Sequence, residues 1–177
     1  MVWAGCEQTL HRPLEWRLGF PVIEVWGMSE MCRMLADCHE PRSIDTRAMG
    51  RPQPGLDIRV VDEKDVEVPR GVPGEMTLRY SAETPRRGAF SGYLNLPDAT
   101  EEAWRGGWFH TGDTVVMDES DMVTFIDRKK NIIRRSGENI AAAEIEACLQ
   151  DHPKVDRVAV VAVADAMRDE EVMACIQ

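Results

Sequence analysis

The chain has 177 residues, of which 44% are hydrophobic and 29% charged, and its formal net charge is −10. This length fits one domain or parts of two, and the hydrophobic content excludes a chain that is disordered throughout. The negative charge argues against a general nucleic-acid-binding protein. The five cysteines are scattered and form no C-x-x-C pair, which favours a reducing compartment over a disulfide framework.

The N-terminal sequence MVWAGCEQTLHRP contains no targeting segment, because Glu7 interrupts it before an apolar run of signal-peptide length can form. No window of the sequence approaches the length of a membrane span. We therefore expect a soluble, cytoplasmic protein.

The first expected strand covers residues 21–25 (PVIEV) and is followed by a turn at Trp26-Gly27. Ligand crevices of α/β sheets open where strands end, so Glu30 is placed to hold Mg²⁺ through oxygen and Trp26 to stack on a nucleobase. Alternatively, Glu30 begins a helix, because the helix dipole favours an acidic residue there.

The middle of the chain predicts short antiparallel strands. Residues 57–62 (DIRVVD) and 74–80 (GEMTLRY) have strand-like composition and flank a charged loop. Gly and Pro are dense in this region, as expected for tight turns. A helix is expected to begin near residues 97–102, with Asp98 or Thr100 as its N-cap.

The segment GWFHTGD at residues 107–113 contains a candidate ligand for a ribose. Asp113 offers only hydrogen-bond acceptors, which suits two sugar hydroxyls. The alternative is a β-turn in which Asp113 bonds its own backbone. We expect His110 to be a surface strand residue rather than a catalyst.

The last third of the chain predicts a separate α+β unit. A strand is also expected at 122–127, before this unit. After about residue 131 the expected elements are a strand at 132–135, a helix at 141–150 and strands at 155–163 and 171–176. Because strands and a helix follow one another in this order, we expect a small domain distinct from the β-rich middle.

Five cations fall within eight positions of this acidic chain: Arg128, Lys129, Lys130, Arg134 and Arg135. Such a basic cluster can hold phosphate, and arginine is the better bidentate partner. The alternative is a solvated face of a hairpin. Lys130 lies at the junction of the two expected units, where a hinge belongs.

Other common sites have no support in the sequence. Cys32, Cys38 and His39 have a spacing that matches no common zinc pattern, so structural cysteines are the better interpretation. The chain contains no G-x-S-x-G, H-E-x-x-H, G-x-G-x-x-G or G-x-x-x-x-G-K-[ST]. Serine hydrolase, zinc peptidase, Rossmann and P-loop interpretations therefore have no support in the sequence.

Taken in order, the motifs resemble those of the adenylate-forming superfamily, which contains acyl-CoA synthetases, luciferases and the adenylation domains of peptide synthetases. The first motif looks like the family's aromatic-Gly-x-Thr-Glu element, with Trp26 in place of Tyr and Ser29 in place of Thr. The segments that resemble family motifs are VWGMSEM, GRPQPG, GVPGE, FSGYLNLPDAT, GWFHTGD and DRKKNIIRRSGENIAAAEIE.

The resemblance implies roles for residues near the N-terminus. Ser29 and Glu30 would contact the ATP phosphates and Mg²⁺. Trp26, followed by Gly27, would lie against adenine, and Gly5 would lie near it in a small-residue adenine loop.

It also implies roles for residues nearer the C-terminus. Asp113 would bind the ribose hydroxyls with help from Arg128. Lys130 would be the hinge of a mobile C-terminal domain, and Gly137 would line the tunnel for coenzyme A.

The implied fold class is α+β. Residues 1–40 would complete a large α/β nucleotide-binding domain, residues 41–129 would form a β-rich, barrel-like subdomain, and residues 130–177 would contain the hinge and an incomplete C-terminal α+β domain. An unfinished sheet leaves an open edge, so pairing of two copies into a homodimer is one expectation.

The implied activity is that of an ATP-dependent acid–CoA ligase, which joins a carboxylic acid to AMP and then transfers the acyl group to coenzyme A. Among branches, the C-terminal sequence looks most like carnitine- or crotonobetaine-type ligases. The identity of the acid is not encoded in these residues.

Two family motifs are missing: the Gly/Ser/Thr-rich phosphate loop and the C-terminal Gly-Lys motif. We therefore expect the chain to be a fragment that is inactive alone. Two alternatives remain open at this point. One is a non-catalytic module that binds a nucleotide or a partner, and the other is an amino-acid-activating domain of a peptide synthetase.

Overall fold

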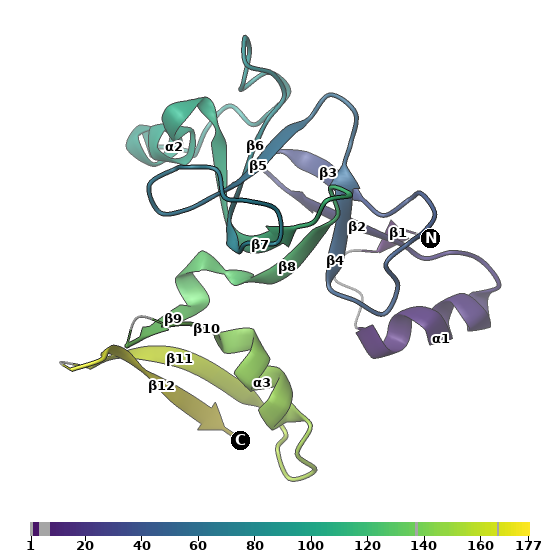
Figure 1. Ribbon diagram of the computed structural model, residues 1–177, viewed down its shortest axis with the longest axis vertical. Helices are drawn as coiled ribbons and strands as arrows, with labels where there is room; N and C mark the ends of the chain where they lie inside the picture. Colours follow the sequence, from purple (N-terminus) through teal and green to yellow (C-terminus); the bar gives the residue numbers. More distant parts are fainter. Residues whose placement is uncertain (1, 4–7, 137, 166) are drawn as a thin grey trace. The chain divides into compact units, whose positions relative to one another are not determined.

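The computed structural model describes residues 2–3, 8–136, 138–165 and 167–177. The chain divides into two compact units, shown in Figure 1. The first unit contains residues 1–111 and 115–125, and the second contains residues 112–114 and 126–177. The residues expected in the adenine loop and the coenzyme A tunnel, Gly5 and Gly137, lie outside the described residues. The three-part domain boundaries stay a prediction.

Most strands belong to one eight-stranded sheet with the order β1-β2-β3-β4-β8-β7-β6-β5. Its strands are β1 (Val2–Trp3), β2 (Ile23–Met28), β3 (Cys32–Ala36), β4 (Ala48–Pro52), β5 (Asp57–Val61), β6 (Gly74–Arg79), β7 (Phe109–Met117) and β8 (Val123–Arg128). The strands β1 and β5 end the order at opposite edges, so the sheet is open. The α+β class is confirmed, but the barrel-like closure expected for the middle of the chain is wrong.

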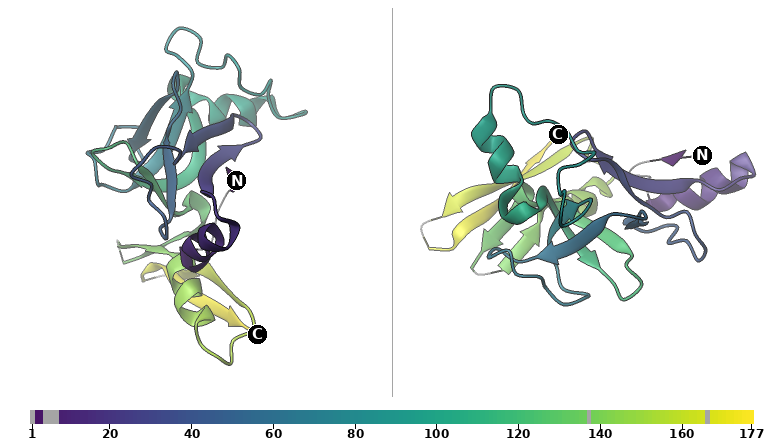
Figure 2. Two further views of the ribbon diagram at one scale, coloured as in Figure 1. Left: turned by 90° about the vertical axis from the view of Figure 1, so that its right-hand side faces the viewer. Right: turned by 90° about the horizontal axis from the view of Figure 1, so that it is seen from above.

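The helices of the first unit are α1 (Gln8–Leu18) and α2 (Pro97–Ala103). Pro97 suits the start of α2, because the first helical residue needs no backbone N–H donor. A long loop without helix or strand connects β6 to α2, and Figure 2 shows it from two sides. Among the described helices of the whole chain, none has both the length and the apolar character to cross a membrane.

The core of the first unit is built from aromatic and aliphatic side chains of the large sheet. Phe109 on β7 is 1% exposed and packs edge-to-face against Trp104, with ring centroids 5.2 Å apart, and against Phe90, at 5.8 Å. Met76 and Leu78 on β6 are fully buried in the same cluster. Thr77, between them, is fully buried as well, and because successive side chains of a strand point to opposite faces, both faces of β6 are covered.

The second unit contains a four-stranded sheet with the order β10-β9-β12-β11, on which one helix packs (Figure 1). Its elements are β9 (Ile132–Arg135), β10 (Glu138–Ala141), α3 (Ala142–Gln150), β11 (Val158–Asp165) and β12 (Asp169–Ile176). Ile145 and Leu149 on α3 face Ile133 and Val160 of the sheet. The strands and the helix expected for this part of the chain are confirmed.

Several local expectations are wrong. Trp26 and Gly27 do not form a turn but lie inside β2, where a register shift separates them. Glu30 lies in the turn between β2 and β3 and begins no helix. Neither Asp98 nor Thr100 caps α2, whose N-cap is Leu96 without a side-chain cap bond.

Thr100 has a different task. It is buried, and its hydroxyl accepts from the backbone N–H of Tyr93 at 2.9 Å and donates to the carbonyl of Leu96 at 3.0 Å. The hydroxyl therefore joins the first turn of α2 to the loop before it.

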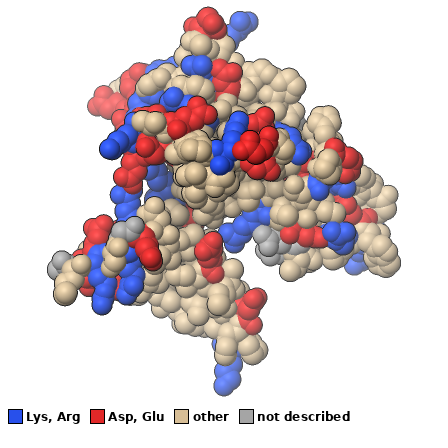
Figure 3. All heavy atoms as spheres, in the orientation of Figure 1, with Lys and Arg blue, Asp and Glu red and all other residues tan. Residues whose placement is uncertain are grey.

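Charged side chains of both signs alternate on the face of the first unit drawn in Figure 3. Arg86 and Glu101 form a bidentate pair with two contacts of 2.7 Å, and Arg79 pairs with Asp57 at 3.0 Å. Because these pairs are exposed, each is worth at most about 1 kcal/mol.

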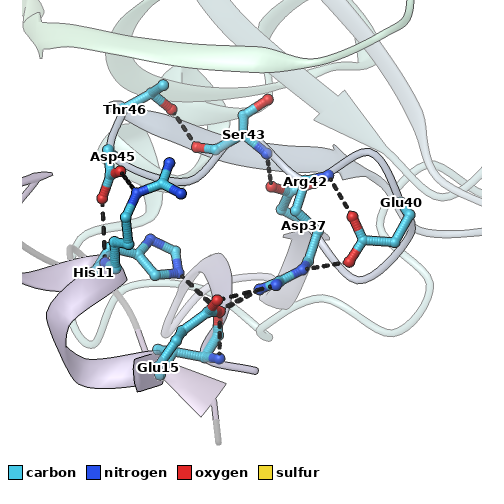
Figure 4. Close-up of polar contacts among 10 residues, drawn as sticks. His11, Glu15, Asp37, Glu40, Arg42, Ser43, Asp45 and Thr46 are labelled. Atoms are coloured by element: carbon cyan, nitrogen blue, oxygen red, sulfur yellow. Dashed lines mark hydrogen bonds and ion pairs between the residues drawn. The ribbon is translucent and has the colours of Figure 1, made fainter. Parts of the chain in front are cut away.

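Helix α1 is held by a polar network with the loop after β3, as Figure 4 shows. The guanidinium of Arg42 contacts the carboxylates of both Glu15 and Glu40. His11 is buried and bonds to the carbonyl of Val22 through Nε2 at 2.9 Å. Because Glu15 also accepts from the backbone N–H of Val22 at 2.8 Å, α1 is fixed to both the loop and the start of β2.

The pair between Glu15 and Arg42 predicts acid-sensitive stability. Hydrogen bonding from Arg42 lowers the pKa of Glu15 from 4.5 to about 2. Since the folded pKa lies below the unfolded one, this stabilisation is complete above about pH 4.5 and is lost as the pH falls towards 2. The wild type loses unfolding free energy between pH 6 and pH 3. We expect this loss to be about 1 to 2 kcal/mol smaller in Glu15→Gln, as measured by urea unfolding at each pH.

Glu40→Gln is the matched control, because Glu40 pairs with the same guanidinium while its side chain is 77% exposed. Arg42 also lowers the pKa of Glu40, but solvent screens this exposed pair, so the control should flatten the pH profile less than Glu15→Gln does. If the profile of Glu15→Gln follows that of the wild type, the pair with Arg42 does not set the acid sensitivity.

Candidate functional site

The residues Trp26, Gly27, Ser29 and Glu30 come together in one hairpin. The strands β2 and β3 pair antiparallel, and the turn between them closes with the N–H of Met31 donating to the carbonyl of Met28 at 3.2 Å. Trp26 is half-buried against the core of the first unit, whereas Gly27 and Ser29 are exposed. The hairpin thus presents its turn to solvent while its base is anchored in the core.

Three contacts hold the turn of this hairpin in place. The carbonyl of Glu30 accepts from the N–H of Phe90 at 2.8 Å, and Oε1 of Glu30 accepts from the hydroxyl of Tyr93 at 3.0 Å. The hydroxyl of Tyr80 donates to the carbonyl of Met31 at 3.3 Å. Burial, and then the nearby Glu30 carboxylate, raise the pKa of Tyr93, which keeps this phenol protonated. The Glu30 carboxylate is therefore half-buried and held by a fixed donor.

Asp113 and Arg128 form the second candidate group, in the second unit. Asp113 is 1% exposed, and its Oδ1 lies 2.8 Å from Nε of Arg128. The Arg128 side chain is 49% exposed, so it reaches from the buried carboxylate to solvent. A buried carboxylate beside a guanidinium offers acceptors and a donor to a polyol such as ribose.

Asp127 was not singled out by the sequence, although it is one of the most buried carboxylates, at 3% exposure. Its Oδ1 accepts from the N–H of Arg128 at 2.7 Å and from Nδ2 of Asn131 at 3.3 Å, and its Oδ2 accepts from the N–H of Ala143 at 3.0 Å. Asp127 therefore joins the basic turn to the first turn of α3, where a carboxylate satisfies a helix N–H and complements the dipole. The sequence feature that could have selected Asp127 is its position directly before the basic cluster.

The basic cluster is partly neutralised by the protein itself. Arg128 pairs with Asp113, and Nε of Arg135 lies 2.7 Å from Glu171 on β12. Lys130 is exposed in a short 3-10 turn at Lys129–Asn131, between β8 and β9. The exposed position of Lys130 between two strands is compatible with the hinge role, which stays a prediction.

His110 is buried rather than on the surface, so that expectation is wrong. Its Nδ1 lies 3.3 Å from Glu75, and its Nε2 lies 3.8 Å from Asp65. Arg105 contacts the same two carboxylates, each at 3.3 Å. The cluster lies within the first unit. Sequence pattern missed its burial because the covering residues come from distant segments.

The hairpin contains a candidate ligand for a hard cation, the carboxylate of Glu30. Among the described residues, no group of three or more His, Cys, Asp or Glu side chains could hold a metal. Glu30 offers a hard carboxylate oxygen, and Mg²⁺ typically takes one or two carboxylates together with phosphate oxygens and water. The described cysteines Cys32, Cys38, Cys148 and Cys175 are free and exposed.

Comparison with known proteins places these motifs in a family. The chain is 39% identical over 153 residues to a long-chain-fatty-acid–CoA ligase of Escherichia coli, which covers 85% of this chain and 26% of that protein. It is 39% identical over 130 residues to a crotonobetaine/carnitine–CoA ligase of Proteus mirabilis, which covers 73% of this chain and 24% of that protein. The chain thus spans about a quarter of the length of these curated relatives.

The fold agrees with this similarity. The crystal structure of ATP-bound MatB from Rhodopseudomonas palustris superimposes with a TM-score of 0.80 and 29% sequence identity, over 99% of this chain and 34% of that one. The family described as AMP-binding enzyme matches residues 2–94, which include the hairpin and the loop that holds Glu30. Since this match covers more than half of the 177 residues, the chain belongs to the AMP-binding enzyme family.

Proposed function

We propose that this chain forms part of an ATP-dependent acid–CoA ligase, which converts a carboxylic acid to an acyl adenylate and then to its coenzyme A thioester. The observation that supports this most is the buried carboxylate of Asp113 beside Arg128 within the family motif GWFHTGD. The relatives named as CoA ligases support the reaction class.

In this proposal each candidate residue has the role that the family resemblance implies. Asp113 accepts hydrogen bonds from the ribose hydroxyls, and Arg128 holds the carboxylate while reaching towards the nucleotide. Trp26 lies against adenine, Ser29 contacts a phosphate, and Glu30 supplies an oxygen to Mg²⁺. Mg²⁺ bound with ATP would neutralise phosphate charge. The carboxylate of the acid attacks the α-phosphate, the bond between the α- and β-phosphates breaks, and pyrophosphate leaves.

The second half-reaction involves the second unit. Lys130 acts as the hinge about which the residues after it turn, and Gly137 lines the route of the coenzyme A thiol. The thiol attacks the acyl adenylate, which forms the thioester and releases AMP. Such closure steps gate turnover in many enzymes.

Finer features also belong to the proposal. Mg²⁺ is the metal that accompanies ATP, the protein acts in the cytoplasm, and two copies pair through an open sheet edge. The relatives include ligases named for long-chain fatty acids and for crotonobetaine and carnitine. We therefore propose only that the substrate is a carboxylic acid, and fatty acids are one class to test.

The test places this chain in the framework of a longer relative. We expect a chimera of the Escherichia coli ligase, in which the aligned 153 residues come from this chain, to form acyl-CoA from a fatty acid, ATP and coenzyme A. The 177-residue chain alone is expected to bind ATP but to form no acyl-CoA, because it spans only 26% of that relative. The readouts are acid-dependent ATP–pyrophosphate exchange and thioester formation.

The parent ligase and a chimera with Asp113→Asn serve as controls. A chimera that folds with a cooperative thermal transition yet shows neither exchange nor thioester formation would contradict the proposed function. A chimera that binds ATP without turnover would support the non-catalytic nucleotide-binding module instead.

A further inference from the structure

We infer that Tyr93 is a positioning residue for Glu30, and that its hydroxyl fixes the carboxylate in the orientation that binds the metal of metal–ATP. This inference rests on the proposed function, since it assigns a role within the same nucleotide site. It concerns a residue 63 positions from Glu30 in the sequence, in a loop without helix or strand.

The first argument is the contact itself. The Tyr93 hydroxyl donates to Oε1 of Glu30 at 3.0 Å, and both side chains are half-buried. A hydrogen bond to a charged acceptor is stronger and more directional than a neutral one. With Oε1 engaged by the phenol, the carboxylate plane is set, and Oε2 and the remaining lone pairs are left to a cation.

The second argument is that Tyr93 is itself held rigidly. Its backbone N–H donates to the buried hydroxyl of Thr100 at 2.9 Å, and its ring packs edge-to-face on Phe90, with centroids 4.9 Å apart. Phe90 in turn packs on Phe109 in the core. The phenol is therefore connected to the core through two aromatic contacts, which limits its movement.

The third argument is the backbone that brings these groups together. Gly92 has a φ of +141°, and a Cβ at this position would lie 3.1 Å from Oγ1 and 3.2 Å from Cγ2 of Thr100. A residue without a side chain lets the loop approach Thr100 closely. The loop also donates the Phe90 N–H to the carbonyl of Glu30, so it holds the backbone and the side chain of the same residue.

The first measurement is a double-mutant cycle for the contact, which needs no nucleotide. Tyr93→Phe and Glu30→Ala are made singly and together in the 177-residue chain, and urea unfolding gives the folding equilibrium constant of each. Tyr93→Phe lowers the folding equilibrium constant by some factor. We expect this factor to be about threefold to tenfold smaller when Glu30 has already been replaced by alanine. Additive effects would overturn the inference, because the two side chains would then not interact.

The second measurement tests the role, using Mn²⁺ with ATP as an EPR-visible probe. Tyr93→Phe is expected to weaken Mn²⁺–ATP binding about fivefold to tenfold, while ATP binding without metal changes less than about twofold. Tyr80→Phe is the matched control, because its hydroxyl contacts the backbone of the same turn and not the carboxylate. Because Tyr80 holds only the backbone of the turn, its loss should weaken Mn²⁺–ATP binding less than the loss of the Tyr93 hydroxyl does.

Equal losses for Tyr93→Phe and Tyr80→Phe, or a loss that persists in full beside Glu30→Ala, would overturn the positioning role. A wild-type chain that binds metal-free ATP but gains nothing from Mn²⁺ would overturn it as well. A wild-type chain that binds no nucleotide in either form would instead contradict the proposed function. In that case, coupling between Tyr93→Phe and Glu30→Ala in the unfolding experiment would show that the Tyr93–Glu30 hydrogen bond stabilises the fold only.

Discussion

Replacing Gly50 with alanine is expected to cost more than about 3 kcal/mol of unfolding free energy, enough to unfold much of the first unit. Gly50 lies in β4 with a φ of +107°, where a Cβ would lie 2.2 Å from the backbone carbon of Ala36 and 2.5 Å from the backbone nitrogen of Asp37. Backbone atoms cannot move away as the end of a flexible side chain can. The strand pair of β3 and β4 would therefore have to separate.

Gly55→Ala is the matched control for Gly50→Ala. Gly55 has a φ of +86°, but a Cβ there would meet nothing within 4 Å. Its cost should be that of the left-handed backbone alone, about 1 to 2 kcal/mol. Urea unfolding followed by far-UV circular dichroism measures both. Equal losses for the two variants would show that the close approach of β4 to β3 does not limit the side chain at residue 50.

Replacing Asp113 with asparagine is expected to weaken ATP binding about 30-fold to 100-fold, because it removes the charge that a buried site uses to accept hydrogen bonds. The side chain is 1% exposed, and Nε of Arg128 lies 2.8 Å from its Oδ1. An amide has nearly the same shape but offers one acceptor and an NH2 donor, which opposes the guanidinium. Titration calorimetry of the 177-residue chain with ATP gives the affinity.

Asp121→Asn is the matched control for Asp113→Asn. It belongs to another aspartate–arginine pair, with Arg70 at 2.6 Å, but its side chain is 57% exposed. The control should bind ATP as the wild type does. The near-UV circular dichroism spectra of both variants must match that of the wild type, so that a loss of ATP binding is not caused by a loss of folding. Wild-type affinity in a folded Asp113→Asn variant would remove this carboxylate from the nucleotide site.

The elements that sequence patterns predicted are those whose signal is local. The strands near residues 57–62, 74–80 and 132–135 were expected from residue type and flanking turns. The helix α3 was expected from apolar residues three and four positions apart, including Ile145 and Leu149. In each case neighbours in the sequence are also neighbours in the element, so the pattern is present in a short window.

The elements that were missed depend on distant residues. Helix α1 contains Pro13, which argues against a helix when a short window is considered alone, and it is held by Arg42, 27 positions from Glu15. Trp26 and Gly27 continue β2 because β3 pairs with them, which overrides the turn preference of glycine. His110 is buried because Glu75 and Arg105 lie around it, and no window of the sequence contains all three.

The order of the motifs and the residue types within them were enough to predict the family and to select Glu30, Asp113 and Arg128 as candidate site residues. The contacts of these side chains could be seen only in the folded chain. The donor to the Glu30 carboxylate is Tyr93, 63 positions away, and the backbone that requires glycine at residue 50 is that of Ala36 and Asp37. Chemical type is a property of one residue, whereas orientation and burial come from contacts between segments that only folding brings together.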